Sequence, residues 1–191
     1  MTYQSFPYHI EEIHLESNKK LLSKIVSCWR QSVEATHDFL TQTDIEHIAR
    51  YVPDAIKSVT HLAVCFKDSK MSNECDSGRL SNSFHTNCNQ TNNDESNESD
   101  YVVGFIGIEK AMIEMLFINP VFRGQGIGTT LLDYAIQKYN PTFVDVNEQN
   151  KQAVVFYEQY GFIVTGRSET DAMGDPFPIL HMQLRKDSRS N

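Results

Sequence analysis

The sequence has few of the features that mark a secreted or membrane-embedded protein. Residues 1–17 lack both the basic start and the apolar run of a signal peptide. No stretch approaches the roughly 20 consecutive apolar residues that a membrane-spanning helix needs. We therefore expect a cytoplasmic protein with no membrane partner, and in that compartment cysteines stay reduced. The expected thiols are Cys28, Cys65, Cys75 and Cys88.

Basic residues are also scarce. Lysine and arginine together number 17 against 25 aspartates and glutamates, which gives a formal net charge of −8. A protein that follows the phosphates of a nucleic acid needs an excess of positive charge, so we expect no nucleic-acid partner. A small anionic ligand is compatible with this charge, because helix ends and nearby cations decide its binding.

Several signatures of metal and hydrolase sites are missing as well. His61, Cys65, Cys75, His85 and Cys88 are all of metal-ligand type. Their spacing lacks the paired C-x2-C and H-x3-H arrangement of zinc sites, so we expect no metal. No Gly-x-Ser-x-Gly elbow is present, which argues against a Ser–His–Asp hydrolase.

Hydrophobic periodicity predicts one domain of mixed α/β structure. A chain of 191 residues with 40 % hydrophobic residues can bury a core of ordinary size. Short apolar runs predict strands at 7–15, 61–66, 101–109, 112–118, 142–146, 162–166 and 177–184. Helical spacing predicts a first helix over 17–35, capped by Ser17 or Asn18. A second helix begins with a Thr43–Glu46 capping box and ends near Pro53. Two further helices are predicted after the glycines at 124–128 and over 150–161.

Residues 67–100 interrupt this pattern. The stretch is rich in Ser, Asn and Asp and has hardly any large aliphatic residues. It cannot bury enough apolar surface to offset the entropy of ordering it, so we interpret it as a disordered insertion in a hairpin loop. The domain is then expected to span residues 6–186, followed by a solvated tail at 187–191.

The segment NPVFRGQGIGTTLLDYA, residues 119–135, places three glycines before a helical pattern. The first amides of a helix lack partners and carry partial positive charge. Gly124, Gly126 and Gly128 would let a phosphate approach those amides, and Arg123 adds a cation. Neither the P-loop nor the Rossmann fingerprint fits this spacing. The alternative is a glycine-rich turn needed only for tight helix–strand packing.

Two separated motifs carry a resemblance to a known family. RGQGIG is similar to the Arg/Gln-x-x-Gly-x-Gly/Ala signature of the GCN5-related N-acetyltransferases (GNAT), and NEQNKQAVVFYEQYGF resembles their second signature. SVEATHDFL and VTGRSETDAMGDPFPIL further resemble the bacterial YjaB-like subgroup. The resemblance implies a single GNAT-type domain: a mixed, mostly antiparallel sheet of six to seven strands flanked by about four helices.

The resemblance also implies an activity. A GNAT enzyme moves the acetyl group of acetyl-CoA directly to a primary amine of a small molecule or of a protein, without a metal, as a monomer or homodimer. The residues that it assigns to acetyl-CoA are Leu116, Phe117 and Ile118 through their backbone, the cradle Arg123, Gly124, Gln125, Gly126, Ile127, Gly128 and Thr129, and Asn150. The alternative is an acyl-CoA-binding sensor without turnover, against which the intact Tyr157 argues.

Tyr157 matches the tyrosine that lies beside the cofactor sulfur in this family. A thiol has a pKa of about 8.5 and a phenol of about 10, so protonating the departing thiolate is uphill by about 2 kcal/mol at these values. Desolvation of the thiolate would reduce that cost. Without the motif, Tyr157 would read as a half-buried aromatic residue. Asn150 could equally be a helix N-cap, and both roles are compatible.

The acceptor amine must lose a proton before it attacks. A lysine-like amine costs about 4.6 kcal/mol to deprotonate at pH 7, and an α-amine only about 1 kcal/mol. Asp145, which alternation points away from its valine neighbours, and Glu114 are the candidate bases, unless ordered water serves. His37 and Asp38 lie on the segment that borders the acceptor site in this family, so His37 could contact the substrate. A local His–Asp hydrogen bond is the simpler interpretation.

Overall fold

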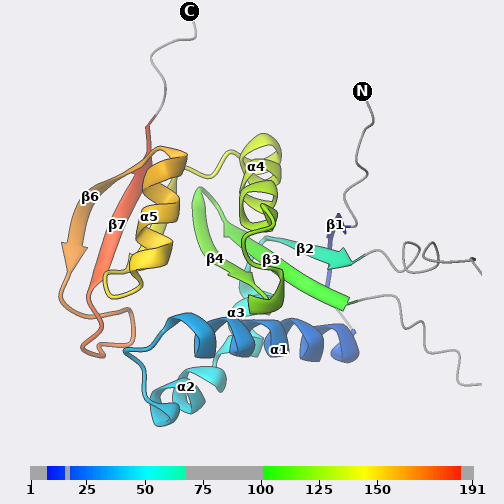
Figure 1. Cartoon of the computed structure of the whole chain (residues 1–191), viewed down its shortest axis with the longest axis horizontal. Helices are drawn as coiled ribbons and strands as arrows, with labels where there is room; N and C mark the ends of the chain where they lie inside the picture. The colour runs from blue at the N-terminus through cyan, green and yellow to red at the C-terminus, as the bar shows by residue number, and fades with distance from the viewer. Residues whose placement is uncertain (1–7, 16–17, 68–100, 186–191) are drawn as a thin grey trace, which may run out of the picture.

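The computed structural model describes residues 8–15, 18–67 and 101–185 and confirms the expected α/β domain. Figure 1 shows β6, β7 and α5 (orange to red) beside β3, β4 and α4 (green). The described elements are β1 (Tyr8–Glu12), α1 (Lys19–Thr36), α2 (Gln42–Ala49), α3 (Val52–Ser58), β2 (His61–Lys67), β3 (Tyr101–Glu109), β4 (Met112–Ile118), the 3-10 turn η2 (Pro120–Phe122), α4 (Ile127–Tyr139), β5 (Phe143–Asn147), α5 (Lys151–Tyr160), β6 (Phe162–Ser168) and β7 (Ile179–Leu184).

The strands form one seven-stranded sheet in the order β1-β2-β3-β4-β5-β7-β6. Every neighbouring pair is antiparallel except β4 and β5, which run parallel. The α4 helix supplies the crossover between those two strands, as a parallel connection requires. The mixed, mostly antiparallel sheet is thus confirmed, with five α-helices in the described part of the chain where about four were expected.

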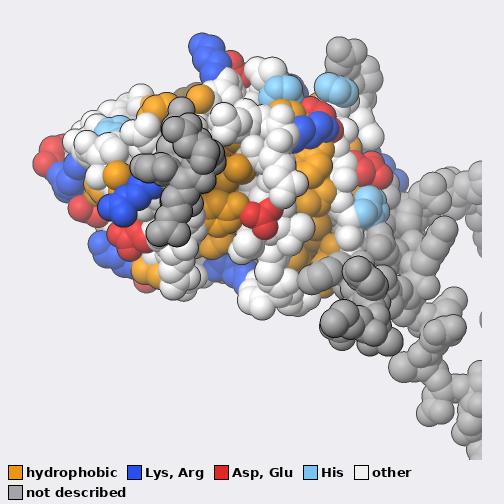
Figure 2. Space-filling model, turned by 90° about the horizontal axis from the view of Figure 1, so that it is seen from above, with side chains coloured by type: hydrophobic (Ala, Val, Ile, Leu, Met, Phe, Trp, Pro, Cys, Tyr) orange, Lys and Arg blue, Asp and Glu red, His pale blue; other side chains and the backbone are white. Residues whose placement is uncertain are grey.

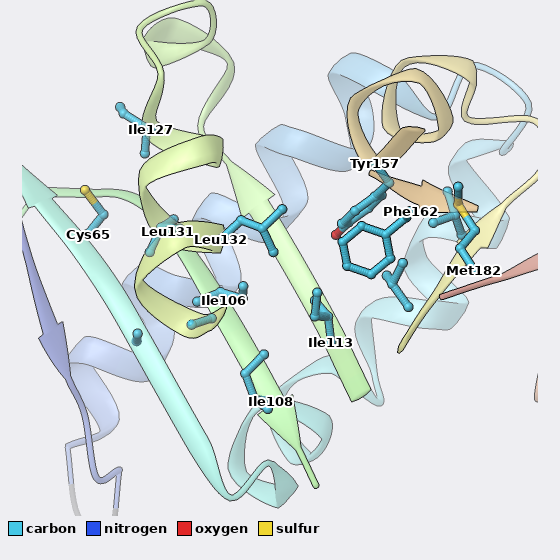
Figure 3. Packing of buried hydrophobic residues seen from close by; sticks show 14 of the residues in the cluster. Cys65, Ile106, Ile108, Ile113, Ile127, Leu131, Leu132, Tyr157, Phe162 and Met182 are labelled. Atoms are coloured by element: carbon cyan, nitrogen blue, oxygen red, sulfur yellow. The ribbon is translucent and has the colours of Figure 1, made fainter. Parts of the chain in front are cut away.

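Helices cover the sheet on both faces, which explains why β2 and β3 read as nearly continuous apolar runs. On one face α4 and α5 pack over residues such as Val103, Ile106 and Val144. On the other face α1, α2 and α3 pack over Val64 and Phe105. Figure 3 shows the first of these layers, with Leu131 and Leu132 of α4 facing the strand that carries Ile106.

Two details of the early helices differ from the sequence interpretation. The capping box that begins α2 is formed by Thr41 and Asp44, and not by Thr43 and Glu46. Both boxes have an acid three residues after a threonine, but only Thr41 has the extended backbone of an N-cap. Pro53 does not end that helix; it lies in the first turn of α3, where a missing N–H costs nothing. The first strand also stops at Glu12, short of residue 15.

The predicted insertion lies almost wholly outside the described residues, because Lys67 still belongs to β2. Lys67 and Tyr101 are register partners in the antiparallel β2–β3 pair. A short loop can therefore join them, as in an ordinary hairpin.

We predict that replacing residues 68–100 with about four Gly/Ser residues leaves the melting temperature within a few degrees. Differential scanning calorimetry of both proteins checks this. A drop of about 10 °C or more would mean that the segment contributes to the core. A metal that binds the wild type and is lost with the segment would also contradict the prediction.

Other described features bear on the earlier expectations. Cys28 and Cys65 are buried free thiols. Among the described residues, no helix is long and apolar enough to cross a membrane, and no group of three or more His, Cys, Asp or Glu side chains is arranged to hold a metal. On the coloured part of the face shown in Figure 2, basic and acidic side chains are interspersed and form no continuous basic band.

Candidate active site

A cleft opens where β4 and β5 separate. The two strands pair only at Met112–Phe143 and Ile113–Val144. On its other side β4 stays paired with β3 as far as Ile118. The part of β4 beyond Ile113 therefore has a backbone edge that does not pair with β5. A cavity of about 440 Å³ lies here, lined by β4, η2, α4, β5, α5 and the end of α1.

A β-bulge at Glu114 accounts for the separation. Ile108 of β3 pairs with Ile113, and the next residue back, Gly107, pairs with Met115, so Glu114 is the extra residue. A bulge bends its strand and re-aims a side chain. This explains how an acid within an apolar run comes to line the cleft.

Most of the predicted site residues meet in this cleft. Gln125 and Asp38 are the two that do not line it. The lining residues among those predicted are His37, Glu114, Leu116, Phe117, Ile118, Arg123, Gly124, Gly126, Ile127, Gly128, Thr129, Asp145, Asn150 and Tyr157.

The glycines of the cradle have conformational reasons of their own. Gly124 and Gly126 have φ of +73° and +80°, a left-handed backbone that side chains disfavour. An added Cβ at either would meet nothing within 4 Å, so protein packing does not require them. A Cβ at Gly128 would lie 3.6 Å from the Phe156 ring, an ordinary contact. No side chain caps the N-terminus of α4, so its first amides lack a protein partner of that kind.

Asn119 anchors the start of the cradle and was missed in the sequence. It is only 2 % exposed. Its backbone N–H donates to the Val103 carbonyl (2.8 Å) and its Nδ2 donates to Gln31 Oε1 (2.6 Å). Its Oδ1 accepts from the Val121 amide (3.1 Å). The Asn-Pro pair, a common turn start, was the available signal.

Side-chain hydrogen bonds also hold the cradle at Gln125 and Arg123. The Tyr8 hydroxyl donates to Gln125 Oε1, which explains why Gln125 faces away from the cleft lining. The Arg123 guanidinium donates to Gln152 Oε1 of α5 (3.2 Å). Arg123 thus lies between α5 and the start of α4 with donors still available.

Tyr157 lies on α5 at the inner end of the cleft. It is 5 % exposed and packs edge-on against Phe156 and Phe162. Figure 3 shows its ring against Phe162, with the hydroxyl on the side of β4 and α4. Burial raises the pKa of the Tyr157 phenol above its usual range, so the hydroxyl keeps its proton at neutral pH. Tyr157 is therefore placed to donate a hydrogen bond within the cleft.

Asn150 and His37 join α5 to the end of α1. Asn150 Oδ1 caps α5 by accepting from the Ala153 amide (3.2 Å), and its Nδ2 lies 3.4 Å from His37 Nε2. The other ring nitrogen, His37 Nδ1, lies 2.9 Å from the Thr36 hydroxyl. These bonds differ from the simple His37–Asp38 pair considered from the sequence. Burial, assisted by the charge of Arg123, lowers the pKa of His37 to about 4, so this imidazole is neutral at pH 7.

Two carboxylates, Glu114 and Asp145, line the same cleft as Arg123. Asp145 lies on β5 between two buried valines and is exposed, as alternation predicted. Its Oδ1 accepts a hydrogen bond from His181 Nδ1 (2.8 Å), a partner that the sequence did not reveal. Burial first, then the charges of Asp145 and Glu109, raise the pKa of Glu114. A raised pKa makes Glu114 a better proton acceptor than an ordinary glutamate.

Comparison with known proteins decides the family. Residues 63–186 match the family model described as the acetyltransferase (GNAT) domain. The chain belongs to this family. It is 34 % identical over 163 residues to the peptidyl-lysine N-acetyltransferase YjaB of Escherichia coli K12. The matched region covers 83 % of this chain and 87 % of that protein.

Solved structures agree with this assignment. The solution structure of apo-form YjaB from Escherichia coli superposes with a TM-score of 0.67 at 30 % identity, covering 92 % of this chain and 96 % of the other. A Thermoplasma acidophilum PaiA N-acetyltransferase in complex with coenzyme A shares the fold, with a TM-score of 0.58 at 18 % identity over 93 % and 99 % of the two chains. The resemblance to the YjaB-like subgroup is thus confirmed. The protein is an N-acetyltransferase, an enzyme that acetylates amines.

Proposed function

We propose that acetyl-CoA is the donor and that the acceptor is a lysine side chain of a protein. The observation that carries this proposal is the charge arrangement of the cleft. Arg123 and the N-terminus of α4 line it after the end of β4, and Glu114 and Asp145 line it from within β4 and β5. The first pair suits an anionic pyrophosphate and the second pair suits a cationic ammonium group. The name of the YjaB relative, a peptidyl-lysine N-acetyltransferase, supports the same acceptor.

The donor side offers groups for each part of acetyl-CoA, which supplies the thioester. The amides of residues 124–129 and Arg123 would hold the pyrophosphate. The unpaired edge of β4, at Leu116, Phe117 and Ile118, would bind the amides of the pantetheine arm as an added strand does. Asn150 lines the same cleft, with its Nδ2 3.4 Å from His37 Nε2. The Tyr157 hydroxyl would then donate to the sulfur as the thiolate leaves.

The acceptor side offers proton acceptors. A lysine ammonium must lose a proton at a cost of about 4.6 kcal/mol at pH 7. Glu114, with its raised pKa, is the better base, and Asp145 can hold the ammonium beside it. The amine lone pair then attacks the thioester carbon, the C–S bond breaks, and the departing thiolate takes the proton of Tyr157. The nitrogen of the new amide gives its extra proton back to the Tyr157 phenolate, and Glu114 releases its proton to solvent.

An acceptor comparison tests this proposal. Wild-type enzyme is incubated with acetyl-CoA and two peptides, one with a free lysine and a blocked N-terminus, and one with the reverse. Thiol release and the mass of each peptide are recorded. We expect acetylation of the lysine peptide at the greater kcat/KM. Preference for the α-amine, or steady binding of acetyl-CoA without thiol release for any amine, would contradict it.

A second prediction concerns the two carboxylates. Glu114→Gln removes a base but keeps the shape of the side chain, and loss of a general base costs about 10²–10⁴-fold in rate. We expect a fall in this range in kcat/KM for the lysine peptide, smallest at high pH where the amine is already neutral. Glu158→Gln is the control, because Glu158 is exposed on α5 and does not line the cleft. Equal rates for Glu114→Gln and the control would rule out Glu114 as the base.

A further inference from the structure

Three side chains on neighbouring strands form a hydrogen-bonded line that ends in the cleft. His181 Nδ1 lies 2.8 Å from Asp145 Oδ1, and His181 Nε2 lies 2.8 Å from the Ser168 hydroxyl. The strands β5, β7 and β6 are adjacent in that order. The line therefore crosses the last three strands of the sheet, from the cleft to the edge strand β6.

The register of the strands builds this line. Asp145 and His181 are direct cross-strand partners. His181 faces Gly166 on its other side, next to a register shift between Val164 and Gly166. A Cβ at position 166 would lie 3.3 Å from His181 Cδ2, so the glycine leaves room for the imidazole to lie over β6. The ring can then reach Ser168, two residues farther along the strand.

The chemistry of the three groups fixes their hydrogens. An ionised carboxylate only accepts, so the imidazole nitrogen that faces Asp145 must carry the hydrogen. In the neutral ring Nε2 is then an acceptor, and the Ser168 hydroxyl donates to it. Asp145 thus selects the tautomer, Ser168 donates to the nitrogen that remains, and His181 supplies the N–H that occupies Asp145 Oδ1.

We propose that His181 and Ser168 are positioning residues for acceptor binding, which hold Asp145 with its second oxygen available to the acceptor ammonium. Asp145 lines the cleft, whereas His181 and Ser168 do not, so of these three side chains the carboxylate is the one that an acceptor in the cleft can contact. An exposed aspartate rotates freely about its last torsion, and a fixed donor removes that freedom before the acceptor arrives. This role rests on the proposed function, because it requires that Asp145 contact the acceptor.

The same order of groups occurs in serine hydrolases, where the serine attacks the substrate. Here Ser168 lies on the edge strand β6 and lines no part of the cleft. The serine is therefore at the wrong end of the line to attack a thioester held between β4 and β5. The hydrogen-bonded line therefore orients the Asp145 carboxylate.

Paired substitutions test the proposal by steady-state kinetics with acetyl-CoA and the lysine peptide. His181→Ala is expected to lower kcat/KM for the peptide about 10- to 100-fold and to leave KM for acetyl-CoA unchanged. His181→Asn keeps an N–H at the same place and should restore most of the activity. Ser168→Ala should lower kcat/KM for the peptide about 3- to 10-fold, as the loss of one hydrogen bond does. Ser168→Thr keeps a hydroxyl and should change kcat/KM little. Thr165→Ala is the control. The exposed Thr165 hydroxyl donates to the backbone carbonyl of His181 and makes no hydrogen bond to the side chains of the line.

A double-substitution cycle separates the two levels of the proposal. If His181 acts through Asp145, adding His181→Ala to Asp145→Asn should lower the rate little further. Asp145→Asn with full activity would defeat the proposed role of Asp145 itself. Reduced activity of Asp145→Asn, with full activity of His181→Ala at an unchanged melting temperature, would defeat only the positioning role. Thiol release from acetyl-CoA without any amine, lost in Ser168→Ala, would overturn the proposal in favour of a nucleophilic serine.

Discussion

Replacing Tyr157 by phenylalanine is expected to slow acetyl transfer about 10²–10⁴-fold and to leave the affinity for acetyl-CoA nearly unchanged. The substitution removes the hydroxyl, while the ring keeps its contacts with Phe156 and Phe162. The cradle and the β4 edge are untouched, so binding should persist. The loss then reflects only the proton or hydrogen bond that the departing thiolate no longer receives.

The burial of Tyr157 changes the expected free energy of proton transfer from its phenol to the thiolate. At reference pKa values the transfer from phenol to thiolate costs about 2 kcal/mol. Burial raises the pKa of Tyr157, which makes the phenol a weaker acid and the full transfer more costly unless the buried thiolate gains proton affinity too. The protonated form persists beyond the ordinary phenol value of about 10, so the alkaline loss of rate should begin above that pH.

The measurement is single-turnover acetylation of the lysine peptide at several pH values, with acetyl-CoA binding followed by calorimetry. Single-turnover conditions keep slow product release from hiding a chemical defect. Tyr160→Phe is the matched control, since Tyr160 lies on the same helix, outside the cleft lining, and its hydroxyl donates to Asp133. Equal single-turnover rates for Tyr157→Phe and the wild type would show that the hydroxyl has no chemical role.

Gly128→Asp should weaken the binding of acetyl-CoA about 100-fold or more. Two like charges about 4 Å apart repel by about 4 kcal/mol at the effective dielectric of a partly buried site, and a carboxylate here would face the expected pyrophosphate. Gly128→Ala is the control for size, because its added Cβ makes only an ordinary contact with Phe156. Gly126→Ala is a less clean test, since its left-handed backbone strains any side chain.

Calorimetric titration with acetyl-CoA measures both Gly128 variants, and circular dichroism verifies that each is folded. We expect near-normal binding by Gly128→Ala and loss of binding by Gly128→Asp. A folded Gly128→Asp protein that binds acetyl-CoA as tightly as the wild type would disprove the cradle assignment.

The local patterns of the sequence predicted much of the fold and of the donor side. Alternating or continuous apolar runs located all seven strands, because burial of one or both faces imposes those patterns. The glycines at 124–128 were found because left-handed backbone and close approach both demand glycine. The capping box at Thr41 was misplaced by two residues, since two threonines offered similar spacing and only the backbone geometry separates them.

The acceptor side depends on register, which a single sequence does not encode locally. The bulge at Glu114 and the separation of β4 from β5 follow from how strands pair across the sheet. His181 and Ser168 meet Asp145 only because β5, β7 and β6 are neighbours with that register. Residues so far apart in the chain leave no periodic signal, and so the line that holds Asp145 was not predicted.

The most direct test of this account is a crystal structure of the protein with bound coenzyme A. The account predicts the pyrophosphate within about 3 Å of the amides of residues 124–129, and the sulfur within hydrogen-bond reach of the Tyr157 hydroxyl, at roughly 3–4 Å. Glu114 and Asp145 should face the sulfur from the open side of the cleft. Coenzyme A bound away from the start of α4, or its sulfur far from both Tyr157 and the two carboxylates, would contradict it.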